Sequence, residues 1–250
     1  MIKERVVIII PTYNESQNIQ ETITQLYQTI QNIHTVEIQV LIFDSHSTDN
    51  TRALVHALQT QYSDLYFMEE PKKTGLGSAY FQAMNHALTH MHADIVMEFD
   101  ADLSHQPKYI APMLTLLRAH DVVIGSRYVP HGSLPEHWGY RRKCLSILGN
   151  YTARLFLTAK YNDFTSGFRA TRRNFLQKSL QEGFASNHYA YKLHLLWSLH
   201  CHGARIVEYP IDFIDRVKGY SKLPSNSIFD ALRVIFLLRY RQLKTLYFAR

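Results

Sequence analysis

The sequence predicts an α/β protein in which a mostly parallel sheet carries helices on both faces. Three observations support this prediction. Short β-branched runs alternate with stretches in which apolar residues recur at helical spacing. Polar residues follow several of these runs directly. The 250 residues, with 46% hydrophobic content, can bury one sizeable core in a single compact domain.

The first half of the chain is predicted to contain five strands with helices between them. The run at 6–10 is continuously β-branched or apolar and predicts a strand. A helix is expected after it, marked by Ile19, Ile23, Leu26, Ile30 and Ile33. The runs at 36–43, 65–68, 94–99 and 122–124 predict further strands, with helices around 54–62, from Gly75 and from about Pro107. Strands joined through helices imply right-handed crossovers and parallel pairing.

The C-terminal segment, 227–250, is expected to form a basic amphipathic helix. Its apolar residues alternate with basic ones, and the net charge of +6 is concentrated from Arg216 to the end of the chain. Such a helix would lie on an anionic membrane surface or pack on the domain formed by 1–226. Nucleic acid is not an expected partner, because the basic residues alternate with aliphatic ones and no recognised binding motif is present.

Two carboxylates, Asp100 and Asp102, come directly after the apolar run at 94–99. A strand that ends there would direct both at one point, where they could hold a divalent cation completed by water and substrate phosphates. The alternative is an acidic turn that caps the next helix. The metal site is favoured because 11–15 and Asp44 also follow strands, and open parallel sheets bind ligands outside the carboxyl ends of their strands.

The sequence lacks the motifs of two other classes of nucleotide-binding protein. A dinucleotide oxidoreductase would carry G-x-G-x-x-G directly after the first strand, whereas the loop at 11–15 contains no glycine. Gly75 and Gly77 form the only Gly-x-Gly, and they follow the third strand. A Walker lysine motif is also absent. Phosphates are therefore expected to be held by a metal ion and side chains.

Seven motifs together resemble the inverting GT-A (Rossmann-like) glycosyltransferases of family 2, and most of all the dolichyl- and polyprenyl-phosphate mannose synthases. They are Pro11-Thr12-Tyr13-Asn14-Glu15, Asp44-x-x-Ser47-x-Asp49, the segment 75–80, Asp100-Ala101-Asp102-Leu103-Ser104-His105, Gly125-Ser126-Arg127-Tyr128, the segment 163–170, and Arg216-x-x-Gly219-x-Ser221-Lys222. The resemblance runs from about residue 6 to 222 and implies transfer of a hexose from a sugar nucleotide to a polyprenyl (dolichyl) phosphate.

The resemblance also implies roles for individual residues. Those expected to bind the donor nucleotide are Pro11, Tyr13, Glu15, Asp44 and Asp100. Asp100 and Asp102 would hold Mg²⁺ or Mn²⁺ on the diphosphate. Those expected to bind the acceptor phosphate are Arg127, Arg142, Arg216, Ser221 and Lys222. Asp102, Arg127 and Arg216 are the expected catalytic residues, and His105 is expected to contact the metal acids or a phosphate.

The expected acceptor follows from an absence in the sequence. Family-2 enzymes with hydroxyl acceptors often carry a Glu-Asp pair in the second half, and the corresponding stretch 186–194 contains no acid. A hydroxyl acceptor needs a general base, whereas a phosphate monoester, with its second pKa at about 6, is already anionic. The acceptor is therefore expected to be a phosphate.

Three positions depart from the family pattern and leave the donor open. Ser45 replaces the second acid of an Asp-Asp pair, and Lys192 and His194 stand where Gln-x-Glu is expected. GDP-mannose is the first expectation for the donor. UDP-glucose with the same or another acceptor is the alternative, and so is a non-catalytic subunit that binds a sugar nucleotide.

Location is inferred from apolar runs and cysteines. The longest fully apolar runs, such as 6–10, are far shorter than the roughly 20 residues of a membrane span. No signal peptide is recognised, and two cysteines fit a reducing compartment. The protein is therefore expected in the cytoplasm, associated peripherally with the cytoplasmic face of a membrane. A membrane-protein partner or a homo-oligomer could assist that association.

Overall fold

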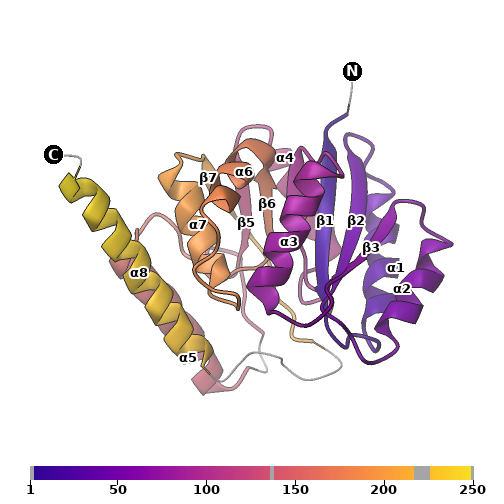
Figure 1. The fold of residues 1–250 in the computed structure, drawn as a ribbon, viewed down its shortest axis with the longest axis horizontal. Helices are drawn as coiled ribbons and strands as arrows, with labels where there is room; N and C mark the ends of the chain where they lie inside the picture. The colour runs from indigo at the N-terminus through magenta and orange to yellow at the C-terminus, as the bar shows by residue number, and fades with distance from the viewer. Residues whose placement is uncertain (1–2, 136–137, 217–225, 249–250) are drawn as a thin grey trace.

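The fold is built on one seven-stranded sheet with helices packed on both of its faces (Figure 1). The computed structural model describes residues 3–135, 138–216 and 226–248. The strands are β1 (Arg5–Thr12), β2 (Glu37–Asp44), β3 (Leu65–Glu69), β4 (Ile95–Glu98), β5 (Val122–Ser126), β6 (Arg169–Arg172) and β7 (Ile206–Pro210). The helices are α1 (Ile19–Ile30), α2 (Thr51–Gln59), α3 (Leu76–Thr89), α4 (Ile110–Leu116), α5 (Tyr140–Phe156), α6 (Arg173–Gln181), α7 (Tyr191–Cys201) and α8 (Ser227–Phe248), with a 3-10 turn at Pro107–Tyr109.

The strand order is β3-β2-β1-β4-β6-β5-β7, and the pairing is mostly parallel. β1 pairs in parallel with β2 and β4, and β2 with β3 and β5 with β7 do the same. β6 runs antiparallel to both of its neighbours, β4 and β5. The predicted mostly parallel sheet is thus confirmed. The antiparallel strand between its two halves was not predicted from the sequence.

Alternating residues along β1 divide the core into two layers. Val6, Ile8 and Ile10 pack with buried residues of α1, α2 and α4 on one face of the sheet. Val7 and Ile9 pack with those of α3, α6, α7 and α8 on the other. Because successive strand side chains point to opposite faces, a continuous apolar run fits a strand that is covered on both sides.

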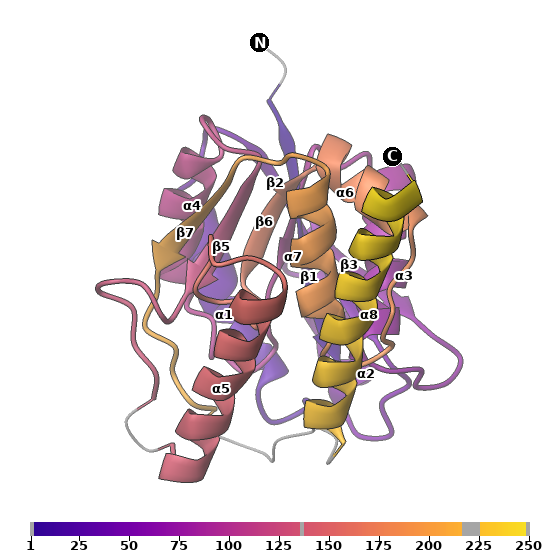
Figure 2. The ribbon, with the colours of Figure 1, turned by 90° about the vertical axis from the view of Figure 1, so that its left-hand side faces the viewer.

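Helices α5 and α8 pack against each other beyond the helices that cover the sheet (Figures 1 and 2). The buried face of α8 presents Val234, Ile235 and Leu238 to the core, and the ring of Phe236 meets that of Phe156 on α5 with centroids 4.9 Å apart. The helix expected from residue 227 is therefore present. Among the described residues, no helix is both long enough and apolar enough to cross a membrane.

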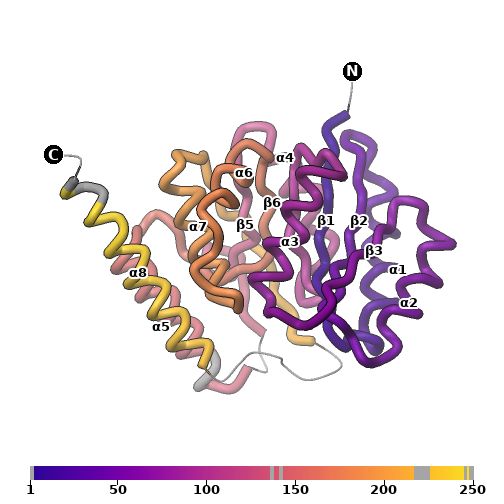
Figure 3. The backbone as a smooth tube through the Cα atoms, viewed as in Figure 1, coloured from indigo at the N-terminus to yellow at the C-terminus, as the bar shows by residue number. Residues whose placement is uncertain are grey.

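The five predicted strands are all present within one to two residues of their expected bounds. The backbone trace shows β1 entering the sheet near the N-terminus, while the C-terminal end of the chain lies at the end of α8 (Figure 3). Because β1 pairs in parallel with both β2 and β4, these three strands end at the same edge of the sheet. Thr12, Asp44 and Asp100 lie at or just after those ends.

Candidate active site at the carboxyl ends of the strands

A cavity of about 290 Å³ lies where β1 and β4 end. Four of the five residues expected to bind the donor line this cavity, and the second expected metal ligand, Asp102, lines it as well. The lining residues are Pro11, Thr12, Tyr13, Glu15, Ser45, Lys73, Thr74, Gly75, Leu76, Asp100, Ala101, Asp102, His188, Tyr189 and Arg216. Residues from six separate stretches of the chain therefore meet at the edge that the parallel topology predicts for a ligand.

Asp100 and Asp102 share this cavity and each has a basic partner. Arg216 Nη2 lies 3.0 Å from Asp102 Oδ2. His105 Nε2 lies 3.4 Å from Asp100 Oδ2, and its Nδ1 accepts a hydrogen bond of 3.0 Å from the Asp100 backbone N–H. Burial raises the pKa of Asp100, but the charges of His105, Lys192, Arg216 and Arg127 outweigh it and hold the pKa below its usual value.

The two aspartates fit a hard divalent cation. Both carboxylates line the same cavity. The Asp102 carboxylate already faces a positive charge there, the guanidinium of Arg216. Within the described ranges no group of three or more His, Cys, Asp or Glu could enclose an ion. Two carboxylates completed by diphosphate oxygens and water are the usual arrangement for Mg²⁺.

Asp44 lies behind the cavity and organises the neighbouring loops. The side chain is fully buried, and its carboxylate accepts hydrogen bonds from Thr12 Oγ1 (2.7 Å), Ser47 Oγ (2.6 Å) and Ser47 N (2.7 Å). Ser45, one of the departures from the family pattern, lines the cavity itself. Direct contact of Asp44 with a donor nucleotide therefore stays a prediction.

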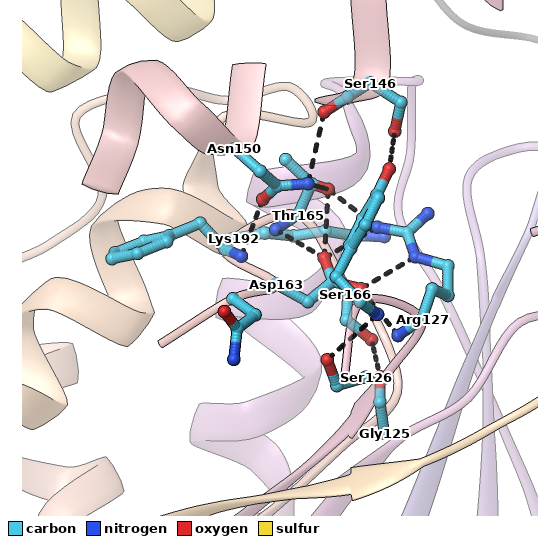
Figure 4. A network of polar contacts seen from close by, with 12 residues as sticks. Gly125, Ser126, Arg127, Ser146, Asn150, Asp163, Thr165, Ser166 and Lys192 are labelled. Carbon is cyan, nitrogen blue, oxygen red and sulfur yellow. Dashed lines mark hydrogen bonds and ion pairs between the residues drawn. The ribbon is translucent and has the colours of Figure 1, made fainter. Parts of the chain in front are cut away.

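Arg127 is held in a buried ion pair that the sequence did not reveal (Figure 4). Its Nε and Nη2 donate to the two carboxylate oxygens of Asp163, both at 2.7 Å, and Nη2 also donates to Thr165 Oγ1. Burial opposes the charge on Arg127, yet Asp163 raises the pKa of that guanidinium; the pairing in turn lowers the pKa of Asp163 against burial. Phosphate binding by Arg127 stays a prediction.

Several lining residues were missed by sequence reasoning. Lys73 places its Nζ 3.5 Å from the ring centroid of Tyr13, beside the expected donor residues. Tyr189 lines the cavity from the segment that precedes α7. For Lys73 a signal existed, because it follows a strand at the same sheet edge. For Tyr189 none existed, since its segment reaches the cavity only through the packing of α7.

Gly75 has a structural reason to be glycine. Its φ is +116°, in the left-handed region, and a Cβ at this position would lie 2.3 Å from the carbonyl oxygen of Asn187. A Cβ on Gly77 would likewise meet the 186–188 backbone, and Gly77 N donates to Asn187 O at 2.8 Å. The two glycines therefore let the start of α3 touch the segment that carries His188 and Tyr189.

Some of the expected acceptor residues cannot be placed. Ser221 and Lys222 lie outside the described residues, and so does the side chain of Arg142. Arg216, the last described residue before that gap, lies at the cavity against Asp102. Their phosphate-binding roles stay predictions.

Comparison with known proteins identifies the family. Residues 7–180 match the family described as Glycosyl transferase family 2. The chain belongs to this glycosyltransferase family. Polyprenol monophosphomannose synthase of Mycolicibacterium smegmatis is 34% identical over 231 residues, covering 92% of this chain and 84% of its own length. Undecaprenyl-phosphate mannosyltransferase of Micrococcus luteus is 32% identical over 228 residues, covering 91% of each chain. The resemblance drawn from the motifs is thereby confirmed.

Solved glycosyltransferase structures share the GT-A fold of this family-2 chain. Glucosyl-3-phosphoglycerate synthase of Mycobacterium tuberculosis, in complex with Mn²⁺, uridine diphosphate and phosphoglyceric acid, superposes with a TM-score of 0.66 at 19% identity, covering 94% of this chain and 78% of that one. A mannosyltransferase of Pyrobaculum calidifontis in complex with GDP-mannose and Mn²⁺ superposes with a TM-score of 0.58 at 18% identity, covering 100% and 77%.

Proposed function

We propose that this glycosyltransferase transfers a hexose, with GDP-mannose as the first candidate donor, to a polyprenyl phosphate in a reaction that requires Mg²⁺ or Mn²⁺. The observation that carries the proposal is the shared cavity of Asp100 and Asp102, bordered by Arg216. The relatives named for polyprenyl-phosphate mannosyl transfer support the acceptor and the sugar.

The donor would bind across the ends of β1 and β4. Pro11, Tyr13 and Glu15 would contact the base and ribose, since an aromatic ring can stack and a carboxylate accepts hydrogen bonds from N–H and O–H groups. Asp100 and Asp102 would hold the divalent ion on the diphosphate. When bound, such an ion neutralises the charge that develops as the nucleoside diphosphate leaves.

The acceptor phosphate would act as the nucleophile without a general base. The carboxylates that line the cavity within the described residues are Glu15, Asp100 and Asp102, all on the expected donor side. His188 and Tyr189 lie near the start of α7, where hydroxyl-transferring relatives are expected to carry acids. A phosphate oxygen would form its bond to the anomeric carbon as the bond to the diphosphate breaks, which inverts the anomer, while Arg216 neutralises the phosphate.

The α5–α8 apolar surface supports peripheral membrane binding. This surface consists of exposed Tyr140, Leu145, Ile147, Leu148, Tyr151 and Leu155 on α5, and Ile228, Phe229, Phe236, Tyr240, Leu243 and Tyr247 on α8. Exposed apolar residues gathered on two helices that pack together are typical of interaction sites. α8 adds Arg233, Arg239, Arg241 and Lys244, and anionic lipid attracts each surface basic residue by about 1 kcal/mol. We therefore assign the bilayer as the occupant of this surface.

The transfer reaction can be tested with radiolabelled GDP-mannose and undecaprenyl phosphate, by measuring label that becomes extractable into organic solvent. Wild-type protein with Mn²⁺ is expected to form this product, and EDTA is expected to abolish it. Asp102→Ala should reduce the rate by about a hundredfold or more, the scale of lost charge stabilisation in other enzymes. Asp64→Asn, an exposed carboxylate before β3, is the matched control and should retain activity.

Two outcomes would overturn this proposal. One is a wild-type protein that binds sugar nucleotides but forms no lipid-linked product, which is the result expected of a non-catalytic subunit. The other is full activity in EDTA. The position of Ser45 in the cavity keeps UDP-glucose as the second candidate donor, and competition of GDP and UDP for the site separates the two bases.

Membrane binding can be tested by co-sedimentation with phosphatidylcholine vesicles that contain or lack phosphatidylglycerol. The protein should bind the anionic vesicles, and the double variant Leu148→Glu/Leu155→Glu should release it without loss of folded structure. Tyr66→Glu introduces a carboxylate at an exposed aromatic on the opposite edge of the sheet and should have no effect. Equal sedimentation of all three proteins would contradict the assignment.

A further inference from the structure

Lys192 is buried without a hydrogen-bonding partner for its charge. It lies in the first turn of α7 and is 6% exposed. Among the described residues its ammonium donates no hydrogen bond and has no carboxylate within ion-pair distance; Nζ lies over the ring of Tyr189, 5.5 Å from the centroid. Burying most of a lysine side chain leaves its ammonium poorly solvated, which costs free energy unless an acceptor meets it. A ligand is the natural source of that acceptor.

The ammonium lies beside the proposed metal acids. A Cβ built on Gly167 would be 2.2 Å from Lys192 Nζ and 3.5 Å from His105 Cε1, so both groups lie over the same glycine. His105 in turn contacts Asp100, and Tyr189 lines the cavity. The charge of Lys192 also lowers the pKa of Asp100. Lys192 is thus close to His105 and to Asp100, one of the two proposed metal ligands.

The nearby carboxylates already have closer partners than Lys192. Glu98 accepts a hydrogen bond of 2.8 Å from Tyr191 Oη and lies 3.7 Å from Arg169 Nε. Asp100 pairs with His105. The guanidinium of Arg169 is fully buried beside Glu98, and its Nε and Nη1 make no hydrogen bond among the described residues, so N–H donors without an acceptor remain behind the cavity. This environment favours a ligand group that only accepts hydrogen bonds or carries negative charge.

We propose that Lys192 binds the sugar of the donor through an oxygen acceptor, either a hydroxyl or a carboxylate, and thereby determines which sugar is transferred. This inference rests on the proposed function and assigns a specificity-determining residue within it. The residue stands where the family pattern has the first position of Gln-x-Glu. An ammonium at this position can only donate hydrogen bonds, whereas an amide could also accept one, so the set of sugars that fit is expected to differ.

The test is calorimetric titration of wild-type protein and Lys192→Met in the presence of Mn²⁺. The ligands are GDP, GDP-mannose and GDP-mannuronate, and the matching series UDP, UDP-glucose and UDP-glucuronate. Lys192→Met should lower the affinity for the preferred sugar nucleotide about tenfold, which corresponds to the loss of a hydrogen bond to a charged group. The affinity for the nucleoside diphosphate should stay unchanged. A preference of wild type for the uronate that the variant loses identifies a carboxylate; preference for the hexose identifies a hydroxyl.

A structural role would give the opposite stability result. Removing an unpaired buried charge should leave the melting temperature of Lys192→Met unchanged or raise it, while sugar binding falls. Gly167→Ala is a second variant, since its methyl group would displace the ammonium and should reproduce the sugar-selective loss. Lys178→Met, an exposed lysine on α6, is the matched control and should bind all ligands normally.

Three results would overturn the inference: equal weakening of GDP and GDP-mannose, which would assign Lys192 to the diphosphate; unchanged sugar binding in both variants; or no sugar-nucleotide binding by the wild type. The titrations use no lipid. A protein that binds sugar nucleotides through Lys192 but forms no lipid-linked product would therefore contradict the proposed function alone.

Discussion

Two polar networks lie at the carboxyl ends of the strands, and they differ in how they hold their carboxylates. In the network after β1 and β2, Asp44 and Asp49 accept hydrogen bonds from neutral hydroxyl and backbone groups. In the network after β5, Asp163 is fully buried and meets the guanidinium of Arg127. Both networks connect loops that are distant in sequence, but only the second places two opposite charges out of water.

The two networks are expected to respond differently when one of their groups is removed. Losing one neutral donor from the first network removes a single hydrogen bond, because Asp44 accepts others from Thr12 Oγ1 and the Ser47 backbone. One charge lost from the second leaves the other buried and uncompensated, which is far more costly. Single substitutions in the first network are thus expected to lower the stability of the fold only moderately. Removing either Arg127 or Asp163 alone is expected to lower it much more.

The largest expected effect comes from Asp163→Ala. It should lower the free energy of unfolding by about 3–5 kcal/mol, because the Arg127 guanidinium would remain buried without its carboxylate. Urea denaturation followed by circular dichroism measures this change. The double variant Arg127→Met/Asp163→Leu should recover most of the loss, since it removes both charges together. A double variant as unstable as the single one would show that packing, not charge, dominates this network.

The same double variant also separates a structural role of Arg127 from a role in binding the acceptor. If Arg127 also contacts the acceptor phosphate, the stable double variant should still lose transfer to polyprenyl phosphate while GDP-mannose binding is retained. If Arg127 only supports the fold, activity should return with stability. Transfer rate and calorimetric donor affinity, measured on the same preparation, distinguish the two roles.

An intermediate effect is expected for Ser47→Ala in the first network. Ser47 Oγ donates to Asp44 Oδ2 and accepts from Asn14 N at 2.8 Å, so it joins the loops after β1 and β2. Its loss should cost about 1.5–3 kcal/mol, the scale of one hydrogen bond to a charged group, because Thr12 Oγ1 and the Ser47 backbone still donate to Asp44. Thermal unfolding measures the change, with exposed Ser63→Ala as the control. A loss as large as that of Asp163→Ala would remove the contrast between the networks.

The smallest effect concerns acid stability and Asp49. Burial works to raise the pKa of Asp49, but hydrogen bonds from Thr51 and Ser16 outweigh it and lower the pKa to about 2 from 3.8. Because the folded-state pKa lies below the unfolded one, the stabilisation is complete above about pH 4 and is lost as the pH falls toward 2. The free energy of unfolding of wild type should therefore fall more steeply across this range than that of Asp49→Asn.

Much of the fold could be predicted because its signals are local. The five strands from β1 to β5 are apolar runs that end in polar residues, and the parallel topology then places those polar residues at one edge. Asp100, Asp102, Tyr13 and Glu15 accordingly meet in one cavity. β6 escaped prediction, since Arg169–Arg172 reads RATR and Arg169 becomes buried only when β4 and β5 pair on either side.

The sequence alone predicted the first five strands with the helices between them, the pair of acids at the sheet edge and membership of the family, because periodicity and motifs depend on neighbouring residues. Only the tertiary structure decided that Arg127 pairs with Asp163, that Asp44 lies behind the cavity, and that Lys192 is buried beside Asp100 without a partner. These relations join residues far apart along the chain. The free energy of a charge depends on which distant groups surround it after folding, and no local pattern contains that information.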